Sequence, residues 1–161
     1  ENLWCCAASW RPHKRLNDNI RYFFEHSGPN DGMIIAGNVP VGDKIKDSKL
    51  HYVGALNQTQ LYSLYKKCKY FVHLAWLDHC PNVVVDARAC GCIIICSSAG
   101  GTKEIAGSNA IVIVENEWDF EPIALYEPPL LDFTKKAKMG LDSKFNMSEV
   151  SKLYKEYIFG V

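Results

Sequence analysis

The feature of this chain that most constrains its fold is a series of short, continuous apolar runs. These runs are Leu3 to Ala8, Met33 to Ala36, His51 to Val53, Tyr70 to Ala75, Ile93 to Ser97 and Ala110 to Val114. Because they are mostly apolar rather than alternating with polar residues, they predict strands buried on both faces. Segments of helical periodicity lie between them, so that strands and helices alternate about every 20 to 25 residues.

Four helical segments are predicted between these strands. One begins at Leu16, and the others cover Leu61 to Cys68, Asn82 to Cys90 and, as a single turn, Thr102 to Ala106. This alternation is typical of βαβ units. We therefore expect a Rossmann-like α/β domain of three layers, with a mostly parallel sheet of about five to six strands and helices on both faces.

After Glu115 the pattern becomes less regular. Pro122, Pro128 and Pro129 predict an extended connection, and the apolar spacing over Val150 to Tyr157 predicts a closing helix. No internal repeat interrupts the 161 residues, and roughly 150 residues make one domain. We expect residues 1–161 to form a single domain.

Composition excludes several classes of protein. The 18 basic and 18 acidic residues give a formal net charge of zero, so the basic excess of a general nucleic-acid binder is missing. No apolar run approaches the roughly 20 residues that span a bilayer. The chain opens at Glu1 with neither a methionine nor a signal peptide, and we expect it to be a fragment or an excised domain.

Seven cysteines, an odd number without a Cys-x-x-Cys pair, indicate reduced and mostly buried thiols. Such thiols are typical of a cytosolic protein and predict a cytoplasmic location. A full-length protein that contains this chain could lie at the cytoplasmic face of a membrane. A zinc site from Cys90, Cys92 and His79 is conceivable, but structural zinc sites normally use wider spacings. No metal site is predicted.

Ligands of parallel sheets bind outside the carboxyl ends of the strands, so the loops that follow the strands hold the candidate residues. The first such loop carries Arg11, Lys14 and Arg15 just before a helix, which suits a diphosphate clamp. A solvated basic turn would have the same composition.

The loop after Tyr70 to Ala75 contains Asp78 at the entrance of a helix, with Asn82 and Asp86 four residues apart on one helix face. Carboxylates there can accept hydrogen bonds from sugar hydroxyls, and the adjacent helix N-terminus favours an anion. The alternative is an ordinary acidic bias at a helix start. The turn Gly100-Gly101-Thr102 can bring backbone amides close to a phosphate or sugar.

Several familiar motifs are missing from the sequence. It contains no Gly-x-Gly-x-x-Gly, no Gly-x-x-x-x-Gly-Lys-Ser/Thr, no Gly-x-Ser-x-Gly and no Asp-x-Asp pair. A nucleotide leaving group would therefore be stabilised by protein cations and helix dipoles. A response-regulator receiver needs an acidic pair after the first strand, and Ala8-Ser9-Trp10 does not provide one.

The segment DHCPNVVVDARACGCIIICSSAGGTKEI, residues 78–105, resembles the donor-binding half of a retaining GT-B glycosyltransferase of family four. That family has two glutamates separated by seven residues, then Ala-x-Ala-Cys-Gly, a strand and Gly-Gly-x-x-Glu. The first loop, ASWRPHKRL, and the segment HYVGALNQTQLYSLYKKCKYFVHLA also resemble the family, so that the likeness spans about residues 3 to 115.

The resemblance implies a role for each matching residue. Lys14 would contact the donor diphosphate, and Ser9 stands where the family has a partner arginine, for which Arg11 or Arg15 could substitute. Asp78 takes the place of the first glutamate, near the transferred sugar. Asp86 takes the place of the second, on the ribose hydroxyls. The other matching donor-binding positions are Gly54 and Leu56 around the base, His79, Cys80, Pro81 and Asn82, and Gly100, Gly101 and Thr102 near the sugar and phosphates.

The implied activity is transfer of a hexosyl group from a UDP- or GDP-linked sugar, with retention and without a metal or another cofactor. Lys14, Arg11 and Asp78 would carry the chemistry. A glycan, lipid or protein acceptor would bind mainly to an amino-terminal domain that this chain lacks, so the isolated chain would be inactive. A degenerate, nonenzymatic binding module is the alternative, since aspartates replace both glutamates.

Overall fold

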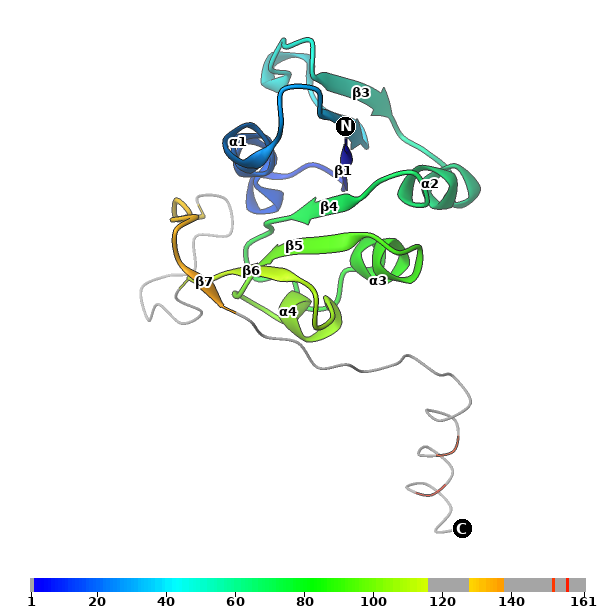
Figure 1. The fold of residues 1–161 in the computed structure, drawn as a ribbon, viewed down its shortest axis with the longest axis vertical. Coiled ribbons are helices and arrows are strands. Elements are labelled where there is room, and N and C mark those ends of the chain that lie inside the picture. The colour runs from blue at the N-terminus through cyan, green and yellow to red at the C-terminus, as the bar shows by residue number, and fades with distance from the viewer. Residues whose placement is uncertain (1, 116–127, 138–151, 153–155, 157–161) are drawn as a thin grey trace.

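The computed structural model describes residues 2–115, 128–137, 152 and 156, and its centre is a seven-stranded sheet in the order β3-β2-β1-β4-β5-β6-β7 (Figure 1). The strands are β1 (Leu3–Ala7), β2 (Gly32–Ala36), β3 (Leu50–Gly54), β4 (Tyr70–His73), β5 (Ile93–Ser97), β6 (Ile111–Ile113) and β7 (Lys136–Ala137). All neighbouring pairs are parallel except β6 with β7. The predicted mostly parallel sheet is confirmed.

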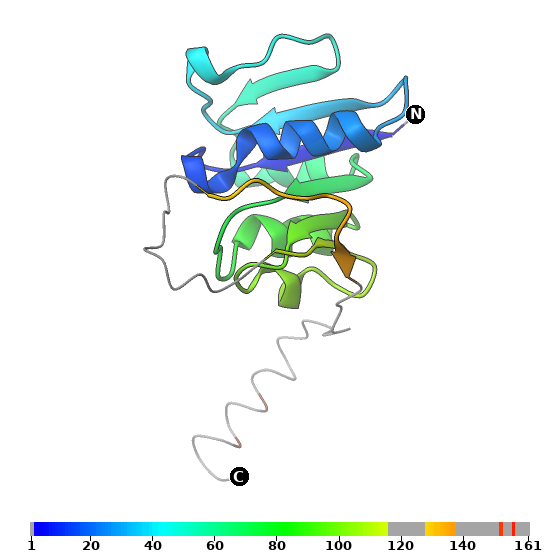
Figure 2. The ribbon, with the colours of Figure 1, turned by 90° about the vertical axis from the view of Figure 1, so that its left-hand side faces the viewer.

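Helices cover both faces of this sheet and make three layers. Helix α1 (Leu16–His26) lies on one face together with the segment that leads into β7, as Figure 2 shows. The opposite face carries α2 (Gln58–Tyr65), α3 (Asn82–Ala89) and α4 (Thr102–Ile105) (Figure 1). Two short 3-10 turns, η1 (Pro12–Lys14) and η2 (Val41–Asp43), follow β1 and β2.

The core is divided by the sheet, because alternate side chains of a strand point to opposite faces. On β1, Trp4 and Cys6 pack with α1 in one buried cluster. Cys5 and Ala7 pack with the helices of the other face in a second cluster. Burial on both faces explains why the strand sequences are apolar without alternation.

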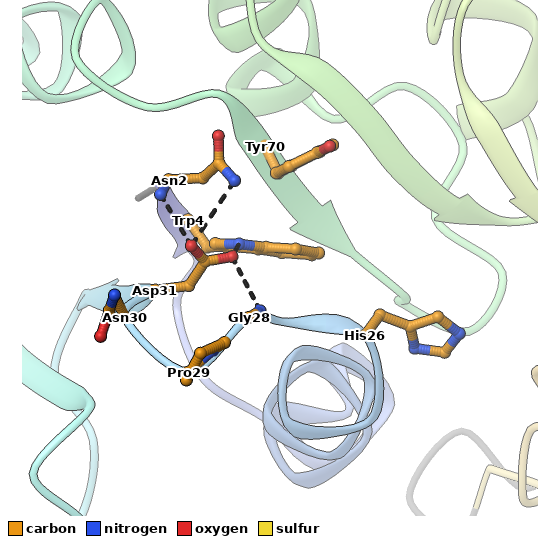
Figure 3. A pocket seen from close by; sticks show the side chains of 8 residues that line it. All are labelled: Asn2, Trp4, His26, Gly28, Pro29, Asn30, Asp31 and Tyr70. Carbon is orange, nitrogen blue, oxygen red and sulfur yellow. Dashed lines mark hydrogen bonds between the residues drawn. The ribbon is translucent and has the colours of Figure 1, made fainter.

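The buried carboxylate of Asp31 ties together the amino-terminal ends of β1 and β2 (Figure 3). It accepts hydrogen bonds from the Asn2 backbone N–H at 2.7 Å, the Gly28 N–H at 3.1 Å and the Trp4 indole Nε1 at 3.0 Å. Burial alone would raise the pKa of Asp31, but these bonds lower it to about 2. A hollow of about 290 Å³ lies beside Asp31. Since the carboxylate oxygens already have protein partners, we assign Asp31 a structural role rather than a ligand-binding one.

Several element bounds differ from the sequence predictions by a residue or two, and three differences have a physical reason. The sheet gains β7, which is only two residues long and therefore has no detectable sequence pattern. Strand β4 ends at His73 rather than Ala75, because the Leu74 N–H donates to the Asn19 side chain at 3.0 Å. Helix α2 begins at Gln58, after a capping box formed by Asn57 and Gln60.

The expected connection at Pro122 lies outside the described residues, and so does the predicted closing helix over Val150 to Tyr157 except for residues 152 and 156. In the part of the chain that the structure describes, no helix is both long and apolar enough to cross a membrane.

Candidate functional site

The candidate site lies where the strand order reverses. The chain leaves β1 towards β2 on one side, whereas β4 pairs with β1 on the other, so a crevice opens at the carboxyl ends of β1 and β4. The loops that follow these strands are joined by a hydrogen bond from the Trp76 N–H to the His13 carbonyl, at 2.7 Å. This hydrogen bond brings together the basic loop, residues 8–15 after β1, and the acidic loop, residues 74–81 after β4.

A cavity of about 370 Å³ lies between these two loops. It is lined by five residues that the sequence singled out, namely Ser9, Arg11, Lys14, Asp78 and Pro81. Sequence reasoning missed its other lining residues, which are Ala7, Ala8, His13, His73 and Val83. Because Pro81 and Val83 flank the first residue of α3, the helix N-terminus adjoins the cavity and favours an anion there.

A lysine, a carboxylate and a histidine form the polar centre of the cavity. The ammonium Nζ of Lys14 lies 2.5 Å from Oδ2 of Asp78, and Nε2 of His73 lies 2.8 Å from the same oxygen. His73 is buried at the end of β4, and the side chain of Asp78 is 16% exposed. The only sequence sign of His73 was a polar residue inside the apolar run that starts at Tyr70.

Burial and neighbouring charges set the pKa values of Asp78, His73 and His13. Burial alone would raise the pKa of Asp78, but the hydrogen bonds from His73 and Lys14 outweigh burial and hold the pKa below its usual range. Burial lowers the pKa of His73, although its bond to Asp78 offsets part of this effect. Burial and the neighbouring Lys14 charge lower the pKa of His13. At neutral pH the cavity is therefore lined by an ionised Asp78 carboxylate and by the neutral imidazoles of His73 and His13.

Backbone strain marks the same two loops. Among the described residues, Arg15 and Leu77 are the non-glycine positions with positive φ, at 50° and 52°. Each is adjacent in sequence to a residue of the polar centre, Lys14 or Asp78. Left-handed backbone costs about 1–2 kcal/mol at such residues and is concentrated at functional sites.

Arg15, one of the two expected substitutes for the family arginine, does not line the cavity. Its side chain is 1% exposed and makes a bidentate ion pair with Glu115, at 2.8 and 2.7 Å. It also donates to the Pro129 carbonyl at 2.8 Å, and its guanidinium lies 5.1 Å from the Trp76 ring centre. These contacts give Arg15 a structural role and leave the exposed Arg11 as the arginine beside Lys14.

The turn Gly100-Gly101-Thr102 supports the acidic loop from behind. A Cβ on Gly101 would lie 2.1 Å from the His79 carbonyl oxygen, and one on Gly100 would lie 2.5 Å from the Asp78 carbonyl oxygen. The Gly101 N–H and the buried Thr102 hydroxyl both donate to the Asp78 carbonyl, at 3.0 and 3.3 Å. Close packing of the two loops thus explains why residues 100 and 101 are glycines. The Gly101 N–H and the Thr102 hydroxyl point to the Asp78 carbonyl rather than into the cavity.

Asp86, which stands in place of the family's second glutamate, lies on α3 outside the cavity. Its oxygen Oδ1 is 3.5 Å from the hydroxyl of Tyr62 on α2, and that hydroxyl accepts a hydrogen bond from Gln58 at 2.6 Å. The remaining candidates do not line this cavity either. Gly54 ends β3 and Leu56 follows it, His79 and Cys80 are exposed in the acidic loop, and Asn82 is the exposed first residue of α3.

The conceivable zinc site is not formed. Within the described part of the chain, no group of three or more histidine, cysteine or acidic side chains is arranged to hold a metal ion. All seven cysteines are free, and five of them are buried, as the sequence predicted for most of them.

Comparison with known proteins gives the family. The model for glycosyl transferases group 1 matches residues 1–121. No curated protein matches the chain. Among solved structures, HepE of Anabaena, in complex with UDP and glucose, matches with a TM-score of 0.66 at 14% identity, over 100% of this chain and 49% of HepE. Sucrose-phosphate synthase of Thermosynechococcus elongatus matches with a TM-score of 0.62 at 13% identity, over 100% of this chain and 47% of that protein.

WaaG, a glycosyltransferase of lipopolysaccharide biosynthesis, matches with a TM-score of 0.57 at 18% identity, over 71% of this chain and 34% of WaaG. The chain thus spans between about a third and a half of the length of these proteins. The fold is that of the carboxyl-terminal, donor-binding domain of a GT-B glycosyltransferase, which confirms the resemblance. The chain belongs to the glycosyl transferases group 1 family.

Proposed function

We propose that residues 1–161 form the donor-binding domain of a retaining glycosyltransferase that takes a hexosyl group from a UDP- or GDP-linked sugar. The observation that carries the proposal is the joint presence of Arg11, Lys14 and Asp78 in one cavity at the switch point of the sheet. The structures of HepE in complex with UDP-glucose and with UDP support a nucleotide-sugar donor.

The chemistry follows from the charges around the cavity. A departing diphosphate needs positive field, which Lys14, Arg11 and the N-terminus of α3 supply. The ionised Asp78 suits hydrogen bonds from sugar hydroxyls and lies near the positive charge that develops at the sugar carbon. This scheme requires no metal. Asp86 would hold the ribose from α3, and the Gly54 to Leu56 loop would adjoin the base.

The acceptor, whether glycan, lipid or protein, would bind mainly to an amino-terminal domain, so we expect no turnover by the isolated chain. We place the protein in the cytoplasm on the strength of its seven unpaired cysteines. The neutral net charge continues to argue against nucleic acid as a partner.

The test is calorimetric titration of the 161-residue chain with UDP, GDP, ADP and their sugar conjugates, with and without magnesium. We expect metal-independent binding of one nucleotide, and a loss of about 10- to 100-fold for Lys14→Met, because a charge-assisted bond is lost. The matched control is Lys67→Met, an exposed lysine outside the cavity. Equal effects of the two variants would contradict the assignment of Lys14.

The competing function is a nonenzymatic module that keeps the donor fold. Asp78 and Asp86 in place of glutamates, and Ser9 in place of an arginine, favour this alternative. A longer protein that contains this chain and transfers sugar, and that loses transfer on Asp86→Ala or Lys14→Ala, would exclude it. Nucleotide binding without any transfer by that protein would support it.

A further inference from the structure

Lys14, which we assign to the donor diphosphate, is already paired with the carboxylate of Asp78. Lys14 Nζ lies 2.5 Å from Asp78 Oδ2, within a half-buried pair whose side chains are 20% and 16% exposed. To bind a diphosphate, Lys14 must give up at least part of this contact. That exchange would leave a partly buried carboxylate without its counter-charge, which is costly unless another donor holds it.

His73 is placed to hold that carboxylate. Its Nε2 lies 2.8 Å from the same Oδ2, and since the ring is neutral beside an ionised carboxylate, Nε2 carries the proton and donates it. The ring belongs to β4 rather than to the loop, is buried, and lies nearly parallel to the Phe71 ring at 6.2 Å. The charged groups that face it are Asp78 and Lys14. The imidazole therefore stays in place when Lys14 moves.

We propose that His73 is a positioning residue of the donor site, which holds Asp78 while a diphosphate takes Lys14 from it. This inference rests on the proposed function. Lys14 exchanges one anion for another, and Asp78 keeps a charged hydrogen bond throughout the exchange. The carboxylate thus remains ionised and fixed at the carboxyl end of β4, where the sugar of the donor is proposed to bind.

A double-mutant cycle on UDP affinity tests the exchange, using the 161-residue chain with His73→Leu, Asp78→Ala and both together. We expect His73→Leu to weaken UDP binding about tenfold when Asp78 is present, because one charged hydrogen bond is lost. In the Asp78→Ala background the same change should have no effect, since the carboxylate that both His73 and Lys14 contact is absent. His73→Gln, whose amide can donate in place of Nε2, should restore most of the affinity.

The control is His51→Leu, an exposed histidine on β3 that does not line the cavity, which should leave UDP affinity unchanged. Equal losses from His73→Leu in both backgrounds would overturn the positioning role and indicate a merely structural one. If the unaltered chain binds none of UDP, GDP and ADP, the donor site itself is wrong. If it binds and the cycle is additive, only the role of His73 is wrong.

A measurement without ligand covers the case in which His73→Leu does not fold. Nitrogen-15 NMR of the unaltered chain at pH 7 should show His73 as a neutral ring protonated on Nε2, with the resonance assigned by its loss in His73→Gln. In Asp78→Ala, which removes the acceptor of the Nε2–H, the ring should lose this fixed tautomer. A doubly protonated ring, or one protonated on Nδ1, would overturn the proposal.

Discussion

Replacing Glu115 by glutamine would remove the bidentate counter-charge of the buried Arg15 guanidinium, and leave Asp18, whose Oδ2 lies 3.9 Å from Nε, as its ion-pair partner. The Arg15 side chain is 1% exposed and that of Glu115 is 8% exposed, so solvent cannot compensate for the loss. Breaking a buried ion pair costs about 3–5 kcal/mol. We expect the lower end, about 3 kcal/mol, because the carbonyls of Leu74 and Pro129 still accept from Arg15, at 3.3 and 2.8 Å.

Urea denaturation measures this loss. With a slope of about 2 kcal/mol per molar urea, the midpoint should fall by about 1.5 M. The double variant Arg15→Leu/Glu115→Leu removes both charges, and it should recover at least half of the lost stability. Since Arg15 does not line the cavity, the folded double variant should bind UDP as the unaltered chain does.

Two results would refute this reasoning. A loss below about 1 kcal/mol in Glu115→Gln would mean that the pair is hydrated rather than buried. Loss of UDP binding in a folded Arg15→Leu/Glu115→Leu variant would return Arg15 to the donor site, as the resemblance allowed.

Other predictions concern a turn, an acid and a thiol. Gly101→Ala should destabilise the chain by more than about 1 kcal/mol in urea denaturation, because its Cβ meets the His79 carbonyl; Gly42→Ala, in open space, should be nearly neutral. Asp31 has a pKa lowered to about 2, so its contribution is present above about pH 4 and lost towards pH 2. The difference in unfolding free energy between the unaltered chain and Asp31→Asn should shrink over that range. Ellman's reagent should modify Cys80 first, and the buried thiols only on unfolding.

The sequence by itself determined the layers and the location of the candidate site. Short apolar runs of strand length that alternate with helical segments are typical of strands covered on both sides, so the parallel sheet followed from the local pattern. Placing Lys14 after β1 and Asp78 after β4 then required only the rule that ligands bind beyond the carboxyl ends of parallel strands. Both residues do line one cavity.

The tertiary structure alone decided which side chains enter that cavity. Arg11 and Arg15 are equivalent in the sequence, but Arg15 is turned away by its left-handed backbone and by an ion pair with Glu115, 100 residues further along the chain. His73 is a polar residue in an apolar strand until the fold places it beside Asp78. Such partners are distant in sequence, and packing between elements, rather than any local pattern, determines which of them meet.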